Sequence, residues 1–115
     1  MAKVTITIKL EEEINKKFKG ESVKIFNMMC SLEKSPRKGK IVGQVGGIII
    51  KEIRYGSFRL YFITDGYKIK LLGKDELSSL LIRFIRMSNK KTQQKVIEEI
   101  KYLLRNFGED INERF

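Results

Sequence analysis

The sequence predicts a single α+β domain over residues 1–115: an antiparallel twisted sheet with an N-terminal helical hairpin packed on one face and a C-terminal helix. Residues 48–63, IIIKEIRYGSFRLYFI, read as two strands joined by a tight turn. Apolar residues at helical spacing come before and after them, within residues 11–34 and 92–106. The predicted order is therefore β-α-α-β-β-β-α, with residues 109–115 as a loose tail.

The N-terminal part changes its hydrophobic period once. Residues 3–10, KVTITIKL, alternate between apolar and polar side chains, which is the pattern of a half-buried strand. From residue 11 the apolar residues recur every four positions, which predicts a helix over residues 11–19. Gly20 separates it from a second amphipathic helix at about residues 21–34. We expect its cysteine, Cys30, to lie in the core as a buried thiol.

A basic loop follows, because the only proline, Pro36, ends the second helix. Its cations Arg37, Lys38 and Lys40 are candidates for nucleic-acid binding through phosphate contacts. A solvated loop would have the same composition, so both interpretations stand. The glycine pair at residues 46–47 then predicts a turn or bulge before the main strand.

The second half of the chain predicts further strands. Asp-Gly at residues 65–66 is a strong signal for a tight hairpin turn, which leads residues 67–72 into an additional strand. Residues 80–87 alternate as the last strand. Arg86 breaks that alternation, which predicts that the strand ends or bulges there.

The charge balance predicts a polyanionic partner. The chain carries 24 Lys and Arg against 14 Asp and Glu, a net charge of +10. Nucleic acid is the first candidate, and no long apolar run supports a membrane. A lysine-rich proteome would produce the same excess without binding. The absence of histidine removes the commonest general base and zinc ligand, and we expect no cofactor. A single cysteine and no secretory segment predict a cytoplasmic protein.

Strand parity predicts where some of these cations point. Phe58, Leu60 and Phe62 share one face of their strand, and Arg59 and Tyr61 share the other. The first set accounts for the buried side, so we expect Arg59 and Tyr61 to be free to point at a ligand. An ordinary hairpin with a solvated outer face explains the same pattern equally well.

Neighbouring elements extend this set into a basic patch. Consecutive hairpins bring Arg54 and Arg83 to the face of Arg59, and Lys90 and Lys91 follow the last strand. Cations at the non-bridging oxygens and an aromatic surface for stacking are what a phosphodiester needs. We therefore expect Arg83 to contribute to nucleic-acid binding.

The patch is also compatible with RNA cleavage that needs no metal. In such cleavage the ribose 2′-OH attacks the adjacent phosphate, arginines neutralise the pentavalent charge, and two protons move. Without histidine, the base has to be a lysine of lowered pKa, a tyrosine or a carboxylate. The residues alone favour a basic-faced nucleic-acid binder over a nuclease.

Three short motifs resemble the RelE/ParE superfamily of toxin–antitoxin toxins, and most of all its HigB-like, phage-derived branch. That branch carries E-[LI]-R on one strand, an aromatic-flanked arginine on the next, and Lys-Lys-Thr-Gln at the start of the final helix. Here these stand at residues 52–54, 58–62 and 90–93. The likeness spans roughly residues 3–105.

The resemblance implies a RelE-like toxin, an endoribonuclease that cuts mRNA, on or off the ribosome, until an antitoxin protein covers its basic face. It assigns phosphate and transition-state contacts to Arg54, Arg59, Lys90 and Lys91. Active relatives place a Tyr or His near the last strand as the acid or base. This sequence has no His, so Tyr61 or Lys91 would have to move protons here.

Two other classes of function stay open. The ParE branch inhibits gyrase without ribonuclease activity, and the same fold also suits a non-catalytic nucleic-acid-binding protein. Alternatively, the apolar stripe within residues 96–107 serves a homodimer or an antitoxin-like partner, although a stripe of this kind is usually core.

Overall fold

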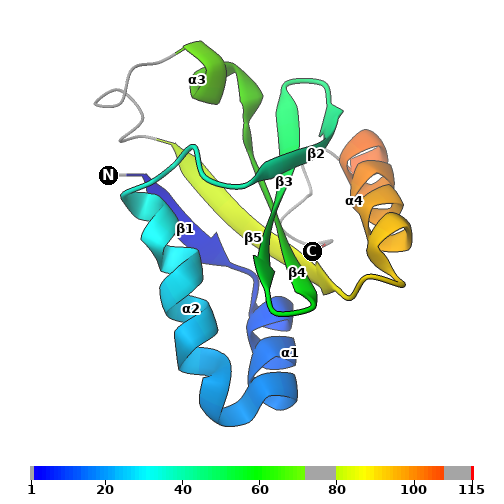
Figure 1. Cartoon of the computed structure of the whole chain (residues 1–115). Coiled ribbons are helices and arrows are strands. Elements are labelled where there is room, and N and C mark those ends of the chain that lie inside the picture. Colours follow the sequence, from blue (N-terminus) through cyan, green and yellow to red (C-terminus); the bar gives the residue numbers. More distant parts are fainter. Residues whose placement is uncertain (1, 72–79, 108–114) are drawn as a thin grey trace.

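The computed structural model describes residues 2–71, 80–107 and 115 (Figure 1). The α+β class is confirmed. The elements in chain order are β1 Lys3–Ile6, α1 Ile8–Phe18, α2 Ser22–Cys30, β2 Lys40–Val45, β3 Ile48–Tyr55, β4 Phe58–Asp65, α3 Gly66–Leu71, β5 Leu81–Ser88 and α4 Gln93–Phe107, with 3₁₀ turns at Lys19–Glu21 and Ser31–Glu33.

The five strands form one mixed sheet in the order β1-β5-β4-β3-β2. The pairs within β2–β5 are antiparallel, whereas β1 runs parallel to β5. The prediction of a wholly antiparallel sheet is therefore wrong at this edge. After β1 the chain crosses to the far edge through the helical hairpin and returns strand by strand, so β5 arrives beside β1 in the same direction. The β3–β4 turn predicted around residue 56 is present. Gly56 adopts the positive φ of +59° in this turn, which is free of steric strain because glycine has no Cβ.

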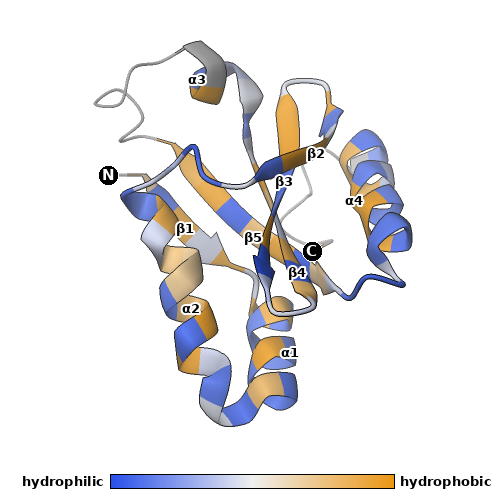
Figure 2. Ribbon diagram, viewed as in Figure 1, coloured by the Kyte–Doolittle hydropathy of each residue, from blue (hydrophilic) through white to orange (hydrophobic). Residues whose placement is uncertain are grey.

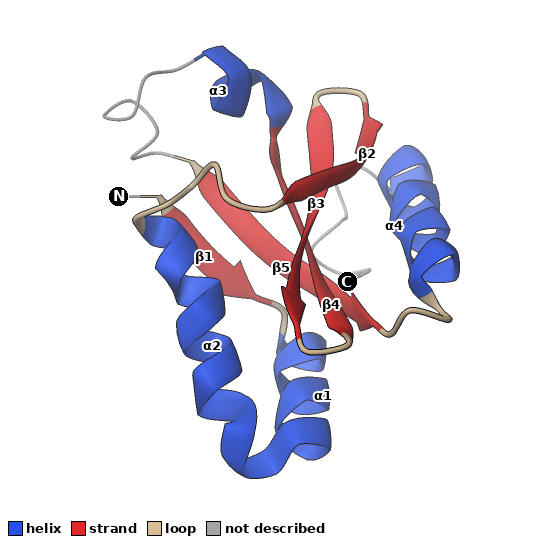
Figure 3. Ribbon diagram, in the orientation of Figure 1, coloured by secondary structure: helices blue, strands red, loops and turns tan. Residues whose placement is uncertain are grey.

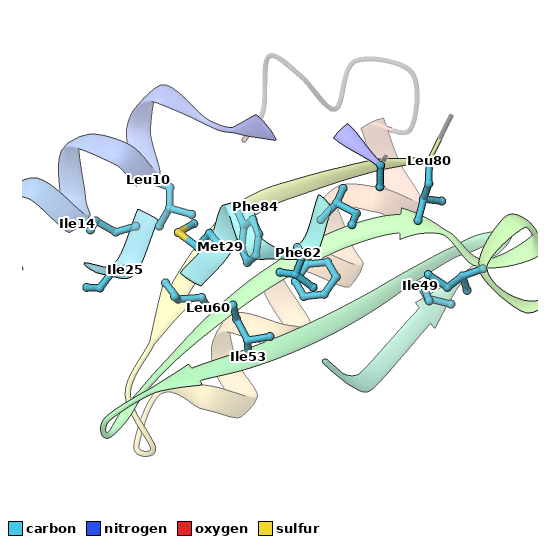
Figure 4. Packing of buried hydrophobic residues seen from close by; sticks show 14 residues of the cluster. Leu10, Ile14, Ile25, Met29, Ile49, Ile53, Leu60, Phe62, Leu80 and Phe84 are labelled. Atoms are coloured by element: carbon cyan, nitrogen blue, oxygen red, sulfur yellow. The ribbon is translucent and has the colours of Figure 1, made fainter. Parts of the chain in front are cut away.

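One face of the sheet packs against α1 and α2, as predicted. Figure 4 shows side chains from both helices pointing at those of the central strands. The rings of Phe62 and Phe84 lie 4.9 Å apart between their centroids. Burying each such side chain contributes about 1.5–3 kcal/mol. The cluster includes Leu10, Ile14, Ile25, Met29, Leu32, Ile49, Ile53, Leu60, Phe62, Leu80, Ile82 and Phe84. We call this face the hairpin side.

The opposite face packs against α4, and we call it the α4 side. Figure 2 shows α4 with its hydrophobic surface turned to the sheet and its hydrophilic surface turned away. This second core contains Ile50, Tyr61, Ile63, Ile85, Ile97, Ile100, Leu104 and Phe115. The predicted apolar stripe of the last helix is thus core over its described part. Of the predicted loose tail, residues 109–114 lie outside the described residues, and Phe115 is buried rather than loose.

The strand predicted over residues 3–10 is shorter than expected. It ends at Ile6, because Thr7 caps α1: its hydroxyl oxygen accepts a hydrogen bond from the backbone N–H of Leu10 at 3.3 Å. Ile8, which the alternation placed in the sheet, is instead a helical residue with 76% of its surface exposed. A local cap therefore overrides the alternating pattern.

The prediction of a hairpin at residues 65–66 is also wrong. The Asp65 carboxylate accepts hydrogen bonds from the backbone N–H groups of Tyr67 and Lys68, at 2.9 and 3.1 Å. An aspartate used in this way starts a helix, and Figure 3 shows α3 directly after β4. The predicted strand over residues 67–72 is therefore helical as far as residue 71, and residue 72 lies outside the described residues.

Two smaller expectations have opposite outcomes. The irregularity predicted at Arg86 is confirmed as a bulge, because Tyr61 pairs with Arg86 and Phe62 with Phe84, which leaves Ile85 without a partner on β4. The expectation of a buried Cys30 is wrong, because its thiol is exposed. The residues of and just after α2 that reach the core are Ile25, Met29 and Leu32.

Candidate nucleic-acid interface

The strand register brings three separated segments into one row on the α4 side. Arg54 of β3 lies directly opposite Arg59 of β4, and Arg59 lies directly opposite Ser88 of β5. Directly opposed residues share a face of the sheet. The row ends where β5 runs into the loop that carries Lys90 and Lys91. The predicted grouping of the three motifs at one end of the sheet is thus what the register produces.

Two like charges stand opposite each other in this row. Opposed like charges destabilise a strand pair, so the position requires nearby anions. Arg59 has one in Glu52, whose carboxylate lies 3.8 Å from its Nε. Arg54 is exposed and forms no ion pair within the described part of the chain. Arg54 is therefore open to an anion from outside.

Arg59 and Glu52 are both buried, with side chains only 8% and 2% exposed. The Arg59 Nη1 group donates a hydrogen bond to the Ser57 carbonyl at 3.3 Å. Its Nε and both carboxylate oxygens of Glu52 have no hydrogen-bond partner among the described residues. The expectation that Arg59 points freely at a ligand is therefore wrong, because its side chain is buried beside Glu52.

Tyr61 is fully buried as well, so the expectation of an outward-pointing phenol is wrong. Its hydroxyl shares a 2.7 Å hydrogen bond with the Ser88 hydroxyl. Burial raises the pKa of the Tyr61 phenol and the Glu52 carboxylate adds to the rise, while the hydrogen bond with Ser88 and the nearby arginines offset only part of it. A phenol of this kind holds its proton at neutral pH.

Lys90 and Lys91 lie exposed in the loop between β5 and α4. Asn89 and Thr92 fix this loop at both ends. The Asn89 side-chain oxygen accepts from the Thr92 N–H at 2.9 Å, and the Thr92 hydroxyl accepts from the Asn89 N–H at 3.2 Å. This reciprocal cap holds the two lysines on a short, ordered loop next to Ser88.

A second row of directly opposed residues lies two positions further along the strands from the β3–β4 turn. It runs Lys40–Glu52–Tyr61–Arg86 across β2 to β5. Lys40 is exposed, so it is a further cation beside Arg54. Arg86 is occupied internally, by Glu99 of α4 at 2.9 Å and by the Phe115 ring at 4.9 Å.

Of the other predicted binding residues, Arg83 shares the α4 side but lies beyond Arg86, opposite Ile63. Arg37 lies on the hairpin side, where it donates a hydrogen bond to the Ile69 carbonyl. The ammonium of Lys51 donates to the Arg37 carbonyl at 2.8 Å, and burial lowers the pKa of that lysine. Arg37 therefore anchors its loop on the other face of the sheet.

Sequence reasoning missed the part that Glu52 and Ser88 play in this arrangement. Glu52 stands two residues before Arg54, which places both side chains on the same face of β3. That spacing was the available signal for Glu52.

Within residues 2–71, 80–107 and 115, no three His, Cys, Asp or Glu side chains are grouped so that they could hold a metal ion. No helix of the same residues is both long and apolar enough to cross a membrane. Comparison of the chain with protein-family models, curated proteins and solved structures finds no match.

Proposed function

We propose that this chain is a RelE-like toxin of a toxin–antitoxin system, an endoribonuclease that binds mRNA at the charged end of the α4 side. The observation that carries the proposal is the row Arg54–Arg59–Ser88. It brings the first two motifs of the resemblance together and ends beside the loop that carries the third. The net charge of +10 favours an RNA partner over a neutral one.

In the proposed reaction the 2′-oxygen of one ribose forms a bond to the adjacent phosphorus, and the bond from phosphorus to the 5′-oxygen breaks. Arg54, Lys90 and Lys91 are exposed and hold the non-bridging oxygens. Arg59 lies directly opposite Arg54 on the neighbouring strand and adds positive potential where charge develops. Preorganised cations of this kind supply the largest part of the catalytic effect in many enzymes.

The proton transfers fall to the residues that reach solvent. The 2′-OH gives up a proton, and the 5′-oxygen takes one as it leaves. Tyr61 is unsuited to be the base, because it is buried and its raised pKa keeps it protonated. Lys91 is the exposed group that the resemblance leaves as the base, and solvent water gives the leaving 5′-oxygen its proton. The antitoxin is proposed to cover the same row with acidic residues.

The test is mRNA cleavage in a translation extract, with and without Arg54→Ala. Arg105→Ala is the matched control, because Arg105 is an exposed arginine in the last turn of α4, outside the row. Wild type and Arg105→Ala should cut the message, and Arg54→Ala should lower the rate at least about 100-fold, as the loss of a transition-state charge contact does. Intact mRNA with micromolar wild type and ribosomes present would refute the nuclease.

A second candidate is a non-catalytic RNA-binding protein on the same fold, and the burial of Tyr61 favours it. It predicts binding without cleavage and an affinity that falls steeply with salt. Four to six phosphate contacts to a single strand give a log–log slope of about −3 to −4. A flat salt dependence would exclude this candidate.

A further inference from the structure

An open pocket of about 190 Å³ lies where α1 meets the tip of the β3–β4 hairpin and the end of β5. This volume corresponds to about six waters at roughly 30 Å³ each, which is room for a planar heterocycle. Its walls come from three parts of the chain. Glu13 and Lys17 belong to α1, Phe58 to β4, and Ser88, Asn89 and Thr92 to the end of β5 and the loop after it.

The aromatic wall of the pocket is held in place from behind. Phe58 is half-buried, and Phe18 meets it edge to face with ring centroids 5.1 Å apart at 88°. The Lys17 ammonium lies over the Phe58 ring, 4.8 Å from its centroid, so this flexible side chain has to move to the edge of any base that stacks there. A fixed aromatic ring at the mouth of a basic site is a stacking surface for a nucleic-acid base.

The polar wall combines two acceptors with one donor. Glu13 and Lys17 stand four residues apart on α1, so they are neighbours on one helix face. Glu13 forms no ion pair with any described residue, which leaves its two oxygens available. Lys17 contributes N–H donors from its ammonium group. The two side chains together supply two acceptors and a donor to the same pocket.

Guanine is the RNA base whose Watson–Crick edge complements two acceptors and a donor. Its Watson–Crick edge offers the N2 amino group and the N1–H as adjacent donors, followed by the O6 acceptor. Adenine and cytosine each place an acceptor beside their single amino group, and uracil has one N–H between two carbonyls. A carboxylate that accepts from two adjacent N–H groups therefore selects guanine.

The pocket adjoins the row that is proposed to hold phosphate. Ser88 belongs to both: it lines the pocket and lies directly opposite Arg59. We propose that the pocket binds a guanine base of single-stranded RNA, with Phe58 stacking on the base, Glu13 accepting from N1–H and N2–H, and Lys17 donating to O6. The proposal rests on the RNA-binding function proposed above and adds a base preference to it.

The test is fluorescence anisotropy with labelled single-stranded oligouridine RNA that carries one central G, A or inosine. Adenine stacks as guanine does, so comparing the two isolates the recognition of the base edge. The G oligonucleotide should bind about 5–10-fold more tightly than the A oligonucleotide, the lower part of the range for a bidentate base contact, because the pocket is open to water. Inosine lacks only the N2 amino group and should fall between them.

Glu13→Gln is the diagnostic variant, since an amide replaces one acceptor with a donor. Glu13 is exposed, so the fold should be retained. The preference for G over A should fall to about twofold or less. Glu12→Gln removes the same charge from an exposed position of α1 outside the pocket and should keep the full preference.

Each other outcome has a separate meaning. Equal binding of the G and A oligonucleotides by wild type would overturn the guanine pocket and leave the RNA-binding function standing. Loss of preference in both Glu12→Gln and Glu13→Gln would also overturn it, because the effect would then be one of net charge. No binding of any oligonucleotide by wild type would refute the proposed function itself.

Discussion

The two sides of the sheet are supplied by the same strands but differ in composition. On the hairpin side, the central strands present Ile53, Leu60, Phe62 and Phe84, and the helices cover them fully. On the α4 side, apolar residues occupy only one part of the sheet, and charged residues occupy the part near the β3–β4 turn. Figure 1 shows α4 lying beside β2 and β5, away from α1 and α2.

This difference separates stability from function. A face filled with large apolar side chains contributes burial energy, and its covered centre leaves no room for a ligand. A face that carries two opposed arginines and a buried, poorly hydrogen-bonded carboxylate has given up stability at that place. Such a departure from good packing is expected at a functional site.

The largest expected effect compares one Leu→Ala substitution on each side. Leu60 and Leu104 are both buried, at 1% and 5% exposure. Leu60→Ala should cost about 4 kcal/mol, because a central strand between two neighbours cannot move to fill the cavity. Leu104→Ala should cost about 2–3 kcal/mol, because α4 can shift on the sheet and alanine favours a helix. Urea unfolding measures both, and a reversed order would contradict the comparison.

The next effect concerns the buried pair on the α4 side. Glu52→Gln leaves the Arg59 charge buried without its counterion and should destabilise the protein by about 3 kcal/mol. The double replacement Glu52→Leu with Arg59→Met should restore stability to within about 1 kcal/mol of wild type, or exceed it. Denaturant unfolding of wild type and these two variants measures both effects. A double variant as unstable as the single one would show that this pair stabilises the fold.

The smallest effect is that of the Tyr61 hydroxyl. Tyr61→Phe removes the hydrogen bond to Ser88 and should cost about 1–2 kcal/mol near neutral pH. Because burial raises the pKa of Tyr61, the folded chain holds the phenolic proton more tightly than the unfolded chain. That contribution is complete below the unfolded pKa of about 10 and is lost as the pH rises through the folded pKa.

The stability difference between wild type and Tyr61→Phe should therefore shrink above about pH 10. Unfolding curves at about pH 8 and about pH 11 measure it. Taking the difference between the two proteins cancels the titration of the lysines, which both share. A difference that stays constant with pH would mean that the phenol is not buried as described.

Much of this contrast was predictable from strand parity. Phe58 to Phe62 alternate, so the sequence predicts which side chains face α1 and α2, and it places Arg59 and Tyr61 opposite them. The bulge at Arg86 was predictable for the same reason. Strand parity carries no information about where a helix that follows the last strand will pack. The burial of Arg59 and Tyr61 on the α4 side was therefore not predictable.

Local hydrogen bonds explain the other differences. Thr7 and Asp65 each lie in a segment whose pattern suits a strand, and each side chain caps a helix instead. The parallel pairing of β1 with β5 depends on contacts between residues about 78 apart, such as Lys3 with Leu81. No local pattern encodes pairing at that separation, so the sheet was predicted as antiparallel throughout.

Binding of RNA at the charged end of the α4 side can be tested by amide chemical shifts on titration with single-stranded RNA. The largest shifts should fall within residues 54–59 and 88–92, whereas α2 on the hairpin side should stay unchanged. Arg54→Ala should weaken the titration, and Arg105→Ala should not. Shifts confined to α2 or to the loop that carries Arg37 would contradict the account.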